Sequence, residues 1–513
     1  MVKSSMLDTL QSLIVAFVLA MVFRGFIIEG FVIPTGSMAP TLLGQHLRLR
    51  STQTGAETAV GLDGGRPDQG RLRDHTVGRQ EQLRPRKADL RPLSGDRVLV
   101  LKTVYPFFEP DRWDVVVFKN PTQPEGPASN FIKRLIGRPG ESIWLVDGDV
   151  FVKAPGEDVF HITRKPDDVQ RGVWQRVHDS TYAPTRPEAL VRTQGPPWLT
   201  APSGAWTHTD GVWVHDNATP ATLTWDDRRI PLDDWVAYNM FSPVPTFPTS
   251  DLLVSGTITP DTAGGSAQLD LTARSHVMRA TFTDTDVRLA MWHVDTPEDR
   301  VEFTASNPGL RPSRASRLEF EHRDQQIIVR VNGNAVLTHA YDWSPRQRLE
   351  YSRGLTGTTM TDRQLVRHLP QAPQLRWQVQ GAPMTVGALT VDRDLFHRRD
   401  LIRSAGQKHA APEGREQEIR SGQPAAATSP ETILTLKDDQ FFMLGDNSGR
   451  SNDGRLWGWP APMVAELYDP DPFVVHRDLL IGKAFAVYFP ASHALTDGGT
   501  GFIPDFGRLR FIR

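Results

Sequence analysis

The chain has 513 residues, of which 39% are hydrophobic, and its formal net charge is −2. A charge this close to zero gives no global attraction for nucleic acid, so we expect no nucleic-acid partner, and the length allows two or three domains. The absence of cysteine excludes disulfides, thiolate catalysis and cysteine-ligated zinc. With 41 glycines and 40 prolines, the composition favours strands, turns and loops over helical bundles, and so predicts a mainly β protein.

The chain begins with an apolar segment. Residues 13–23 form an unbroken apolar run inside the broader stretch 7–28, and about 20 residues are needed to span a bilayer. A cleaved signal peptide is the alternative, but Phe23-Arg-Gly-Phe26 contains no small-x-small cleavage site. Lys3 before the run favours a cytoplasmic N-terminus. We therefore expect residues 1–30 to be a single-pass anchor in the cytoplasmic (inner) membrane, with the rest of the chain on the extracytoplasmic (periplasmic) side.

A stiff turn that contains a serine follows the apolar segment. This serine turn, residues 34–41, reads Pro34-Thr-Gly-Ser-Met-Ala-Pro-Thr41. Gly36 permits a positive φ, and the two prolines fix φ on either side, so the turn holds the Ser37 hydroxyl rigidly. A hydroxyl fixed at a membrane surface suggests a nucleophile for a substrate that the membrane delivers.

Residues 45–93 are rich in Arg, Gly and Gln and show neither a helical nor a strand period. This pattern predicts an irregular, solvated insert without a fold of its own. A basic surface that contacts anionic lipid is the alternative, although acidic residues are interspersed.

Short β-rich runs separated by Pro and Gly begin at residue 94 and return after residue 431. The clearest is a hairpin over residues 142–152, whose turn is Asp147-Gly148. We expect residues 31–153 and 431–513 to be the two parts of one antiparallel β domain, split by an insert over residues 154–430.

Within the insert, residues 249–400 contain regularly spaced alternating strands. The best-defined piece is a hairpin over residues 326–337 with the turn Asn332-Gly333. Such spacing predicts a β-sandwich, and its pattern is similar to lectin-like jelly rolls. The polar residues 401–430 are predicted to be a linker back to the first domain.

A serine nucleophile needs a base, and none of the 15 histidines lies in a recognisable triad context. Lys133 is a candidate, because it lies in an apolar strand between Ile132 and Leu135, and burial favours a neutral amine that can accept a proton. The alternative is a solvated charge on an edge strand, since lysine is rarely buried.

The third polar cluster is the support loop, residues 445–455, which follows an apolar strand. Ser451, Asp453 and Arg455 alternate along it, which suggests a hydroxyl and an ion pair that support the lysine. A purely structural loop and a calcium site are the alternatives, but the closing Glu of a calcium-binding loop is absent.

The three clusters and their order, after an N-terminal anchor, resemble type I signal peptidases, the membrane-bound Ser-Lys endopeptidases of the S26 family. The matching motifs are Ser-Met-x-Pro-Thr, Lys-Arg-x-x-Gly-x-Pro-Gly and Gly-Asp-Asn-x-x-x-Ser-x-Asp-x-Arg, at residues 37–41, 133–140 and 445–455. The resemblance covers residues 7–44, 94–153 and 432–513, less than half of the chain. It implies a split antiparallel β catalytic domain of the signal-peptidase type, with the lectin-like insert outside the family core.

The resemblance also implies roles. Ser37 attacks the peptide carbonyl, Lys133 takes its proton, and the Thr35 hydroxyl and Ser37 N–H hold the oxyanion. Ser451 would hold the lysine amine. The residues that support the dyad would be Ser451, Asp453, Arg455, Asp446 and Asn447. Exported preproteins would be cleaved after small residues in the Ala-x-Ala pattern, without a cofactor or metal. The shallow pockets would be formed by Phe31, Ile33, Met38, Leu42 and Ile132.

Two other functions fit parts of the sequence. A membrane-anchored Ser-Lys autoprotease of the repressor-cleavage type would share the catalytic fold, but the chain lacks a DNA-binding helix-turn-helix. A non-catalytic envelope protein whose insert binds carbohydrate would not need Ser37 or Lys133. In either case the insert could bind an additional, unknown envelope ligand.

Overall fold

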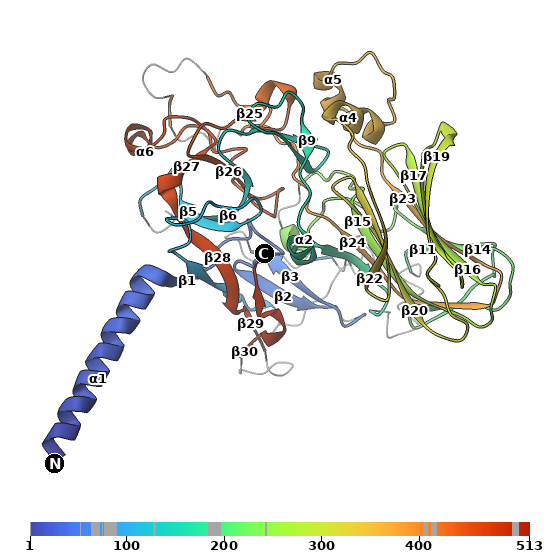
Figure 1. The fold of residues 1–513 in the computed structure, drawn as a ribbon, viewed down its shortest axis with the longest axis horizontal. Helices are drawn as coiled ribbons and strands as arrows, with labels where there is room; N and C mark the ends of the chain where they lie inside the picture. Colours follow the sequence, from blue (N-terminus) through green and yellow to red (C-terminus); the bar gives the residue numbers. More distant parts are fainter. Residues whose placement is uncertain are drawn as a thin grey trace.

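The computed structural model describes residues 2–51, 53–62, 72–73, 75, 90–126, 130–182, 196–241, 244–403, 409–411, 418–494 and 502–512. Helix α1 (Val2–Val22) continues into the wider π-type turn η1 (Phe23–Ile27) and extends away from two β-rich bodies that lie side by side (Figure 1). Among the described residues, Asp8–Ile27 is the one helical segment long and apolar enough to cross a membrane, with a hydropathy of 2.1. No part of that segment packs inside the protein, which agrees with the predicted anchor.

The first body is a β domain built from both ends of the chain. Its main sheet has the strand order β1-β4-β28-β5-β6-β26-β27, with β31 beside β28. These strands are β1 (Ile28–Val32), β4 (Arg97–Leu101), β5 (Val115–Lys119), β6 (Asn130–Gly137), β26 (Gln440–Leu444), β27 (Val475–His476), β28 (Leu480–Phe489) and β31 (Arg510–Phe511). Because β28 separates β4 from β5, and β26 pairs with β6, the segments before and after the insert form one sheet.

A smaller sheet with the order β25-β7-β8-β9 packs beside it. Its strands are β7 (Ser142–Val146), β8 (Asp149–Lys153), β9 (His161–Ile162) and β25 (Leu434–Thr435). The predicted hairpin is present, and both of its turn residues have positive φ, 51° at Asp147 and 91° at Gly148. A two-residue turn of this kind matches the right-handed twist of the flanking strands.

The insert forms a sandwich of two sheets, with the orders β12-β13-β24-β15-β20-β21-β22 and β11-β14-β23-β16-β17-β18-β19, and with β10 paired to β24. The early strands are β10 (Gln175–Asp179), β11 (Trp198–Ala201), β12 (Thr207–Thr209), β13 (Val212–His215) and β14 (Ala221–Trp225). The later strands are β15 (Leu252–Pro260), β16 (Ser266–Ala273), β17 (His276–Phe282), β18 (Val287–His293), β19 (Thr296–Ala305), β20 (Ser316–Arg323), β21 (Gln326–Val331), β22 (Asn334–Ala340), β23 (Gln374–Gln380) and β24 (Met384–Arg393). The sandwich therefore begins near residue 175, well before the predicted residue 249, because β10 to β14 supply edge strands to both sheets.

Short elements connect these layers. The helices are α2 (Asp167–Val173), α4 (Pro345–Arg353), α5 (Asp362–Arg367) and α6 (Pro462–Leu467). The 3-10 turns are η4 (Ala237–Asn239), η6 (Pro430–Thr432), η7 (Arg477–Leu479) and η8 (Phe506–Arg508). A small hairpin near the C-terminus pairs β29 (Ser492–Ala494) with β30 (Phe502–Pro504).

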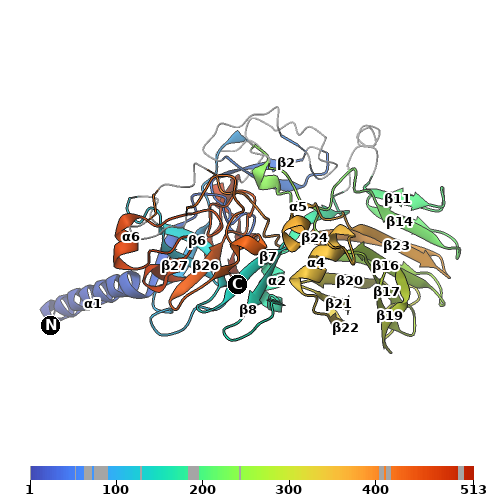
Figure 2. The same cartoon turned by 90° about the horizontal axis from the view of Figure 1, so that it is seen from above.

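The prediction that residues 45–93 lack strands is wrong for its described part. Strands β2 (His46–Arg50) and β3 (Glu57–Gly61) form an antiparallel hairpin, seen beside the junction of the two bodies in Figure 2. Leu47 and Leu49 are fully buried, and part of their core is supplied by Met240 of the insert. The apolar partners lie far away in sequence, so the local pattern alone did not reveal the hairpin. Residues 63–71, 74 and 76–89 lie outside the described residues.

The predicted polar linker, residues 401–430, is also more ordered than expected where it is described. Ile402, Ile419 and Ala425 pack with Trp459 and Phe473 in a small apolar core. These side chains are separated by polar residues, so their shared core was not visible as a periodic pattern.

Buried ion pairs join the insert to the first body. Asp147, in the β7–β8 turn, accepts from Arg274 Nε at 3.0 Å and from Arg348 Nε at 3.1 Å, and these three side chains are almost completely buried. Removing one partner of a buried pair leaves an uncompensated charge, so these contacts fix the insert to the first domain.

Candidate active site

Three segments that are distant in sequence meet at the candidate site. The serine turn follows β1, Lys133 lies on β6, and the support loop follows β26, the neighbour of β6. The sheet order therefore places Lys133 beside the support loop. The serine turn follows β1, at the far end of this sheet, and meets the support loop through the hydrogen bond from the Asn447 N–H to the Ser37 carbonyl at 3.1 Å.

The central contact joins the serine and the lysine. Lys133 Nζ lies 2.8 Å from Ser37 Oγ, within hydrogen-bond distance, and also donates to the carbonyl oxygen of Ile132 at 3.0 Å. The Lys133 residue is 3% exposed, while Ser37 is partly exposed. This geometry lets an amine take a proton from a hydroxyl that substrate can reach.

Burial lowers the pKa of Lys133 to about 8, because desolvation disfavours its charged form. The carboxylates of Asp453 and Asp446 act in the opposite direction and keep the pKa from falling further. The lysine can therefore be neutral at mildly alkaline pH, unlike an exposed lysine.

Asp446 and Arg134 form a fully buried bidentate pair. Arg134 Nε and Nη2 donate to the two carboxylate oxygens of Asp446 at 2.8 and 2.7 Å, and Arg134 Nη1 donates to the Trp113 carbonyl at 2.8 Å. Burial would raise the pKa of Asp446, but the guanidinium outweighs it and holds that pKa below its usual value. Because Arg134 follows Lys133 on β6, this pair ties the lysine strand to the support loop.

Asp453 and Arg455 form a second buried pair within the support loop. Arg455 Nε and Nη2 each donate to a carboxylate oxygen of Asp453 at 2.9 Å, and the Gly445 N–H donates to Asp453 Oδ2 at 3.0 Å. Arg455 Nη1 also donates to the carbonyl of Arg398, a residue of the insert, at 2.8 Å. The predicted ion pair is thus present in the structure, and the insert braces it.

Ser451 does not make the predicted contact. Its residue is 3% exposed, and its hydroxyl has no hydrogen-bond partner among the described residues. The Lys133 amine donates to Ser37 and to the Ile132 carbonyl instead. The prediction that Ser451 holds the lysine amine is therefore not met in this structure.

Gly445 leaves the space that Ser451 and the serine turn occupy. A Cβ atom at Gly445 would lie 2.1 Å from Ser451 Oγ and 2.5 Å from the carbonyl oxygen of Ser37. No side chain larger than hydrogen fits there without moving the serine turn.

Gly445→Ala is therefore expected to lower the free energy of unfolding by about 1–3 kcal/mol, as overpacking in a well-packed core does. Gly172→Ala is the matched control, because a Cβ there meets nothing within 4 Å and the site is helical, so it should be neutral or slightly stabilising. Denaturant unfolding of both variants measures the difference. Equal stabilities would contradict this packing.

A reciprocal amide pair connects the insert to the serine turn. Asn239 Nδ2 donates to Asn447 Oδ1 at 2.7 Å, and Asn447 Nδ2 donates to Asn239 Oδ1 at 2.8 Å. Asn447 Nδ2 also lies 2.8 Å from the Gly36 carbonyl oxygen, and the Asn447 N–H donates to the Ser37 carbonyl at 3.1 Å. Asn447 thus holds the peptide on each side of the nucleophile, and Asn239 of the insert orients Asn447.

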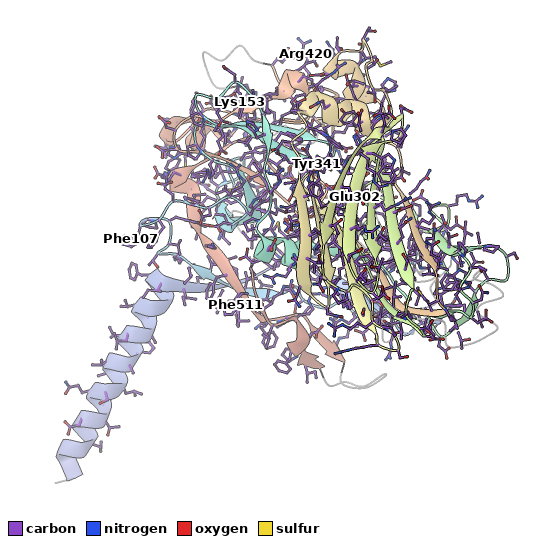
Figure 3. All side chains as sticks on the ribbon, turned by 45° about the vertical axis from the view of Figure 1, so that its right-hand side comes forward. Phe107, Lys153, Glu302, Tyr341, Arg420 and Phe511 are labelled. Atoms are coloured by element: carbon purple, nitrogen blue, oxygen red, sulfur yellow. The ribbon has the colours of Figure 1, made fainter. Side chains whose placement is uncertain are left out.

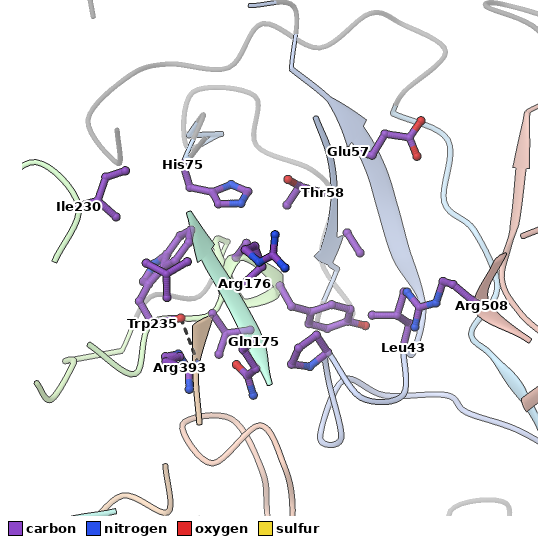
Figure 4. Close-up of a pocket in the computed structure, with 16 residues that line it drawn as sticks. Leu43, Glu57, Thr58, His75, Gln175, Arg176, Ile230, Trp235, Arg393 and Arg508 are labelled. Carbon is purple, nitrogen blue, oxygen red and sulfur yellow. Dashed lines mark hydrogen bonds between the residues drawn. The ribbon is translucent and has the colours of Figure 1, made fainter. Parts of the chain in front are cut away.

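Tyr238, beside Asn239, packs against the back of the serine turn. Its ring fills the space beside Gly36, and its hydroxyl donates to the Gln45 carbonyl at 2.8 Å. Behind this contact is a cavity of about 270 Å³, where the insert, β3 and the segment after Ser37 meet around Trp235, Thr58 and Leu43 (Figure 4). Neither Ser37 nor Lys133 lines this cavity, so it is separate from the dyad.

The two predicted oxyanion donors have no partner in the described part of the chain. Thr35 is exposed, and neither its hydroxyl nor the Ser37 N–H is engaged there in a hydrogen bond. Both can therefore donate to a substrate oxygen.

The five predicted pocket residues lie in or against one apolar core. Met38 and Leu42 are completely buried and Ile33 is 2% exposed, whereas Phe31 and Ile132 are partly exposed. Only the last two present surface that a small substrate side chain can contact, and the other three underlie them. In the described residues, no group of three or more His, Asp or Glu side chains is arranged to hold a metal ion.

Part of the chain matches a family of known proteins. Residues 88–183, which include the lysine motif, match the family model described as signal peptidase, peptidase S26. This part of the chain is therefore similar to the signal peptidases of the S26 family. A signal peptidase I of Leptolyngbya laminosa is 37% identical to the chain over 78 residues, which are 14% of this chain and 38% of that protein.

A signal peptidase I of Pseudomonas aeruginosa is 26% identical over 223 residues, which are 42% of this chain and 61% of that protein. The chain thus spans less than two thirds of the length of these relatives. Among solved structures, a carbohydrate-binding module from Bacillus subtilis covers 38% of this chain and 95% of its own, with 11% identity and a TM-score of 0.24. A likeness this low assigns no ligand to the insert.

Some residues of the signal peptidase site were not predicted from the sequence. Asn239 and Tyr238 lie in the insert and carry no motif, so no sequence signal marks them. The ion pair of Arg134 could have been predicted. Arg134 follows Lys133 on the same buried strand, where a second charged side chain needs a partner of opposite charge.

Proposed function

We propose that this protein is a signal peptidase I, a serine endopeptidase that removes N-terminal signal peptides from exported preproteins by means of a Ser-Lys dyad. The observation that carries the proposal is the 2.8 Å contact between Lys133 Nζ and Ser37 Oγ, made by a buried lysine whose pKa is lowered to about 8. A structural lysine at an edge strand would be solvated and would keep its usual pKa.

The dyad performs acyl transfer in two steps. Neutral Lys133 takes the proton of Ser37, whose Oγ attacks the scissile carbonyl, and the Ser37 N–H and Thr35 hydroxyl donate to the oxyanion. The lysine ammonium then protonates the leaving amine, and the signal peptide remains as an ester on Ser37. Neutral Lys133 next takes a proton from water, which attacks the ester and restores the serine.

The membrane supplies the substrate in this proposal. With α1 in the cytoplasmic membrane and the N-terminus in the cytoplasm, the catalytic domain lies at the outer face, where signal peptides end. Exposed Phe107 lies near the junction of α1 with the body (Figure 3), where it can enter the interface. Phe31 and Ile132 would then select small side chains, in the Ala-x-Ala pattern, by excluding larger ones.

The direct test is cleavage of a purified preprotein by the full chain in detergent, with the cut bond mapped by mass spectrometry. We expect one cut after a small residue at the end of the signal peptide, and no cut by Ser37→Ala. An intact preprotein with the folded wild-type chain, or cleavage that survives Ser37→Ala, would refute the proposal.

The pH dependence follows from the lysine. Only neutral Lys133 accepts the serine proton, so kcat should rise about tenfold per pH unit below the pKa and level off above about pH 8. A kcat profile measured from acid to alkaline pH checks this. A profile that is flat from acid to neutral pH would mean that lysine is not the base.

A further inference from the structure

A cavity of about 670 Å³ lies within the insert, and it is lined neither by Ser37 and Lys133 nor by the support loop. It is lined by Phe247, by α5 and by residues 398–403, together with residues near Ser429. Its lining includes five arginines and two carboxylates, so it has an excess of positive charge. The arginines are Arg363, Arg367, Arg398, Arg399 and Arg403.

The two carboxylates of the lining pair with only two of its five arginines. Arg363 pairs with Glu431 at 2.6 Å, and Arg403 pairs with Asp400 at 3.3 Å. Arg399 donates to the Arg367 carbonyl at 3.3 Å and has no carboxylate within ion-pair distance among the described residues. The lining therefore holds a cation, Arg399, that has no carboxylate counter-ion among the described residues.

Arg398 adds an independent observation. Its side chain is 7% exposed, its Nε has no hydrogen-bond acceptor among the described residues, and its Asp234 partner is 3.7 Å away. The Arg398 and Arg399 guanidinium groups both lie over the Phe247 ring, at 4.9 and 5.3 Å from its centre. Burial lowers the pKa of Arg399, which shows that its positive charge is partly desolvated.

We propose that this cavity binds a soluble organic anion, with a phosphate or carboxylate group between Arg367 and Arg399. Guanidinium groups bind both anions through paired, charge-assisted hydrogen bonds. The apolar side chains of Val244, Val366 and Leu401 in the lining provide contacts for the organic part of the ligand. In Figure 1, α5 lies at the top of the molecule and α1 leaves it at the lower left, which places the site away from the bilayer and favours a soluble anion over a lipid headgroup.

The site is also connected to the catalytic machinery. The Arg398 N–H donates to Ser448 Oγ at 3.0 Å, and its carbonyl accepts from Arg455. An anion in the cavity would hold Arg398 in place and so stabilise the support loop, independently of whether the dyad is active.

The test is isothermal titration calorimetry of the full chain in detergent with phenyl phosphate, inorganic phosphate and soluble dihexanoyl phosphatidylglycerol. We expect saturable binding, tightest for phenyl phosphate. The Arg367→Gln/Arg399→Gln double variant should bind at least about tenfold more weakly. Arg228→Gln is the control, because that exposed arginine lies outside the cavity and should leave binding unchanged.

Three outcomes would overturn the proposal. The first is the absence of saturable binding by wild type, and the second is equal binding by the double variant. The third is tighter binding of the lipid headgroup than of phenyl phosphate, which would assign the site to the membrane. Circular dichroism checks that the double variant is folded. If the double variant is misfolded, the single variant Arg367→Gln is used in its place, because the Arg367 side chain is exposed.

Discussion

Lys133→Met is expected to lower kcat for preprotein cleavage by about ten-thousand-fold or more, with little change in stability. General-base catalysis alone contributes up to about ten-thousand-fold, and the lysine also donates the proton to the leaving amine. Methionine keeps the length and apolar stem of lysine in a site that is 3% exposed, so the fold should tolerate it. The measurement is kcat at about pH 9, where wild-type Lys133 is mostly neutral.

Lys153→Met is the matched control, because Lys153 lies on β8 and is partly exposed, and its ammonium lies 5.8 Å from the centre of the Phe160 ring and forms no ion pair among the described residues. That variant should retain the wild-type kcat. A folded Lys133→Met enzyme that cleaves at a normal rate would show that another group is the base.

Asn239→Leu should lower kcat about a hundredfold, although Asn239 belongs to the insert and touches neither Ser37 nor Lys133 directly. Leucine keeps the branched shape of asparagine, although it is larger, and it removes both hydrogen bonds to Asn447, whose amide holds the Gly36 carbonyl. A displacement of about 1 Å at a nucleophile can cost a hundredfold in rate. The pH at which kcat reaches half its maximum should stay near 8, because the surroundings of Lys133 are unchanged.

The control for this variant is Asn307→Leu, at an exposed asparagine of the insert. Its kcat should equal that of the wild type. If Asn239→Leu also has the wild-type kcat while remaining folded, the insert does not position the nucleophile. If kcat falls and the pH midpoint of the kcat profile also moves, the substitution acts on the lysine and not on the serine turn.

The three motifs could be predicted because each is a local arrangement of residues with its own chemistry. Ser37 is held in a turn of Gly and Pro, Lys133 lies in an apolar strand, and Asp453 and Arg455 pair two residues apart. The Asp147-Gly148 turn is similarly local, since its two positive φ angles follow from the residue types. In these places the sequence within a few residues determines the structure.

The rest of the fold and of the candidate site depends on contacts between residues that are distant in sequence. Asn239 and Asn447 are 208 positions apart, and neither residue carries a signal for the other. Hairpin β2–β3 could not be predicted from its own sequence for the same reason, because Met240 of the insert completes the core around Leu47. Such partners can be recognised only after the sheet and the insert are placed in space. For the same reason, the sequence placed the insert outside the family core and did not reveal that its Tyr238 packs against the serine turn.

The proposal that Lys133 is the general base has a direct test that uses the absence of cysteine. In Lys133→Cys the introduced thiol is the only one in the chain, so alkylation with 2-bromoethylamine before refolding rebuilds a lysine analogue at this position alone. Its sulfur withdraws electrons and lowers the pKa of the amine. The measurement is kcat against pH before and after alkylation. The dyad predicts no cleavage before alkylation, cleavage afterwards, and a profile whose midpoint lies at lower pH than in the wild type. Alkylated enzyme that stays inactive although it is folded, or a midpoint that does not move, would contradict a lysine base.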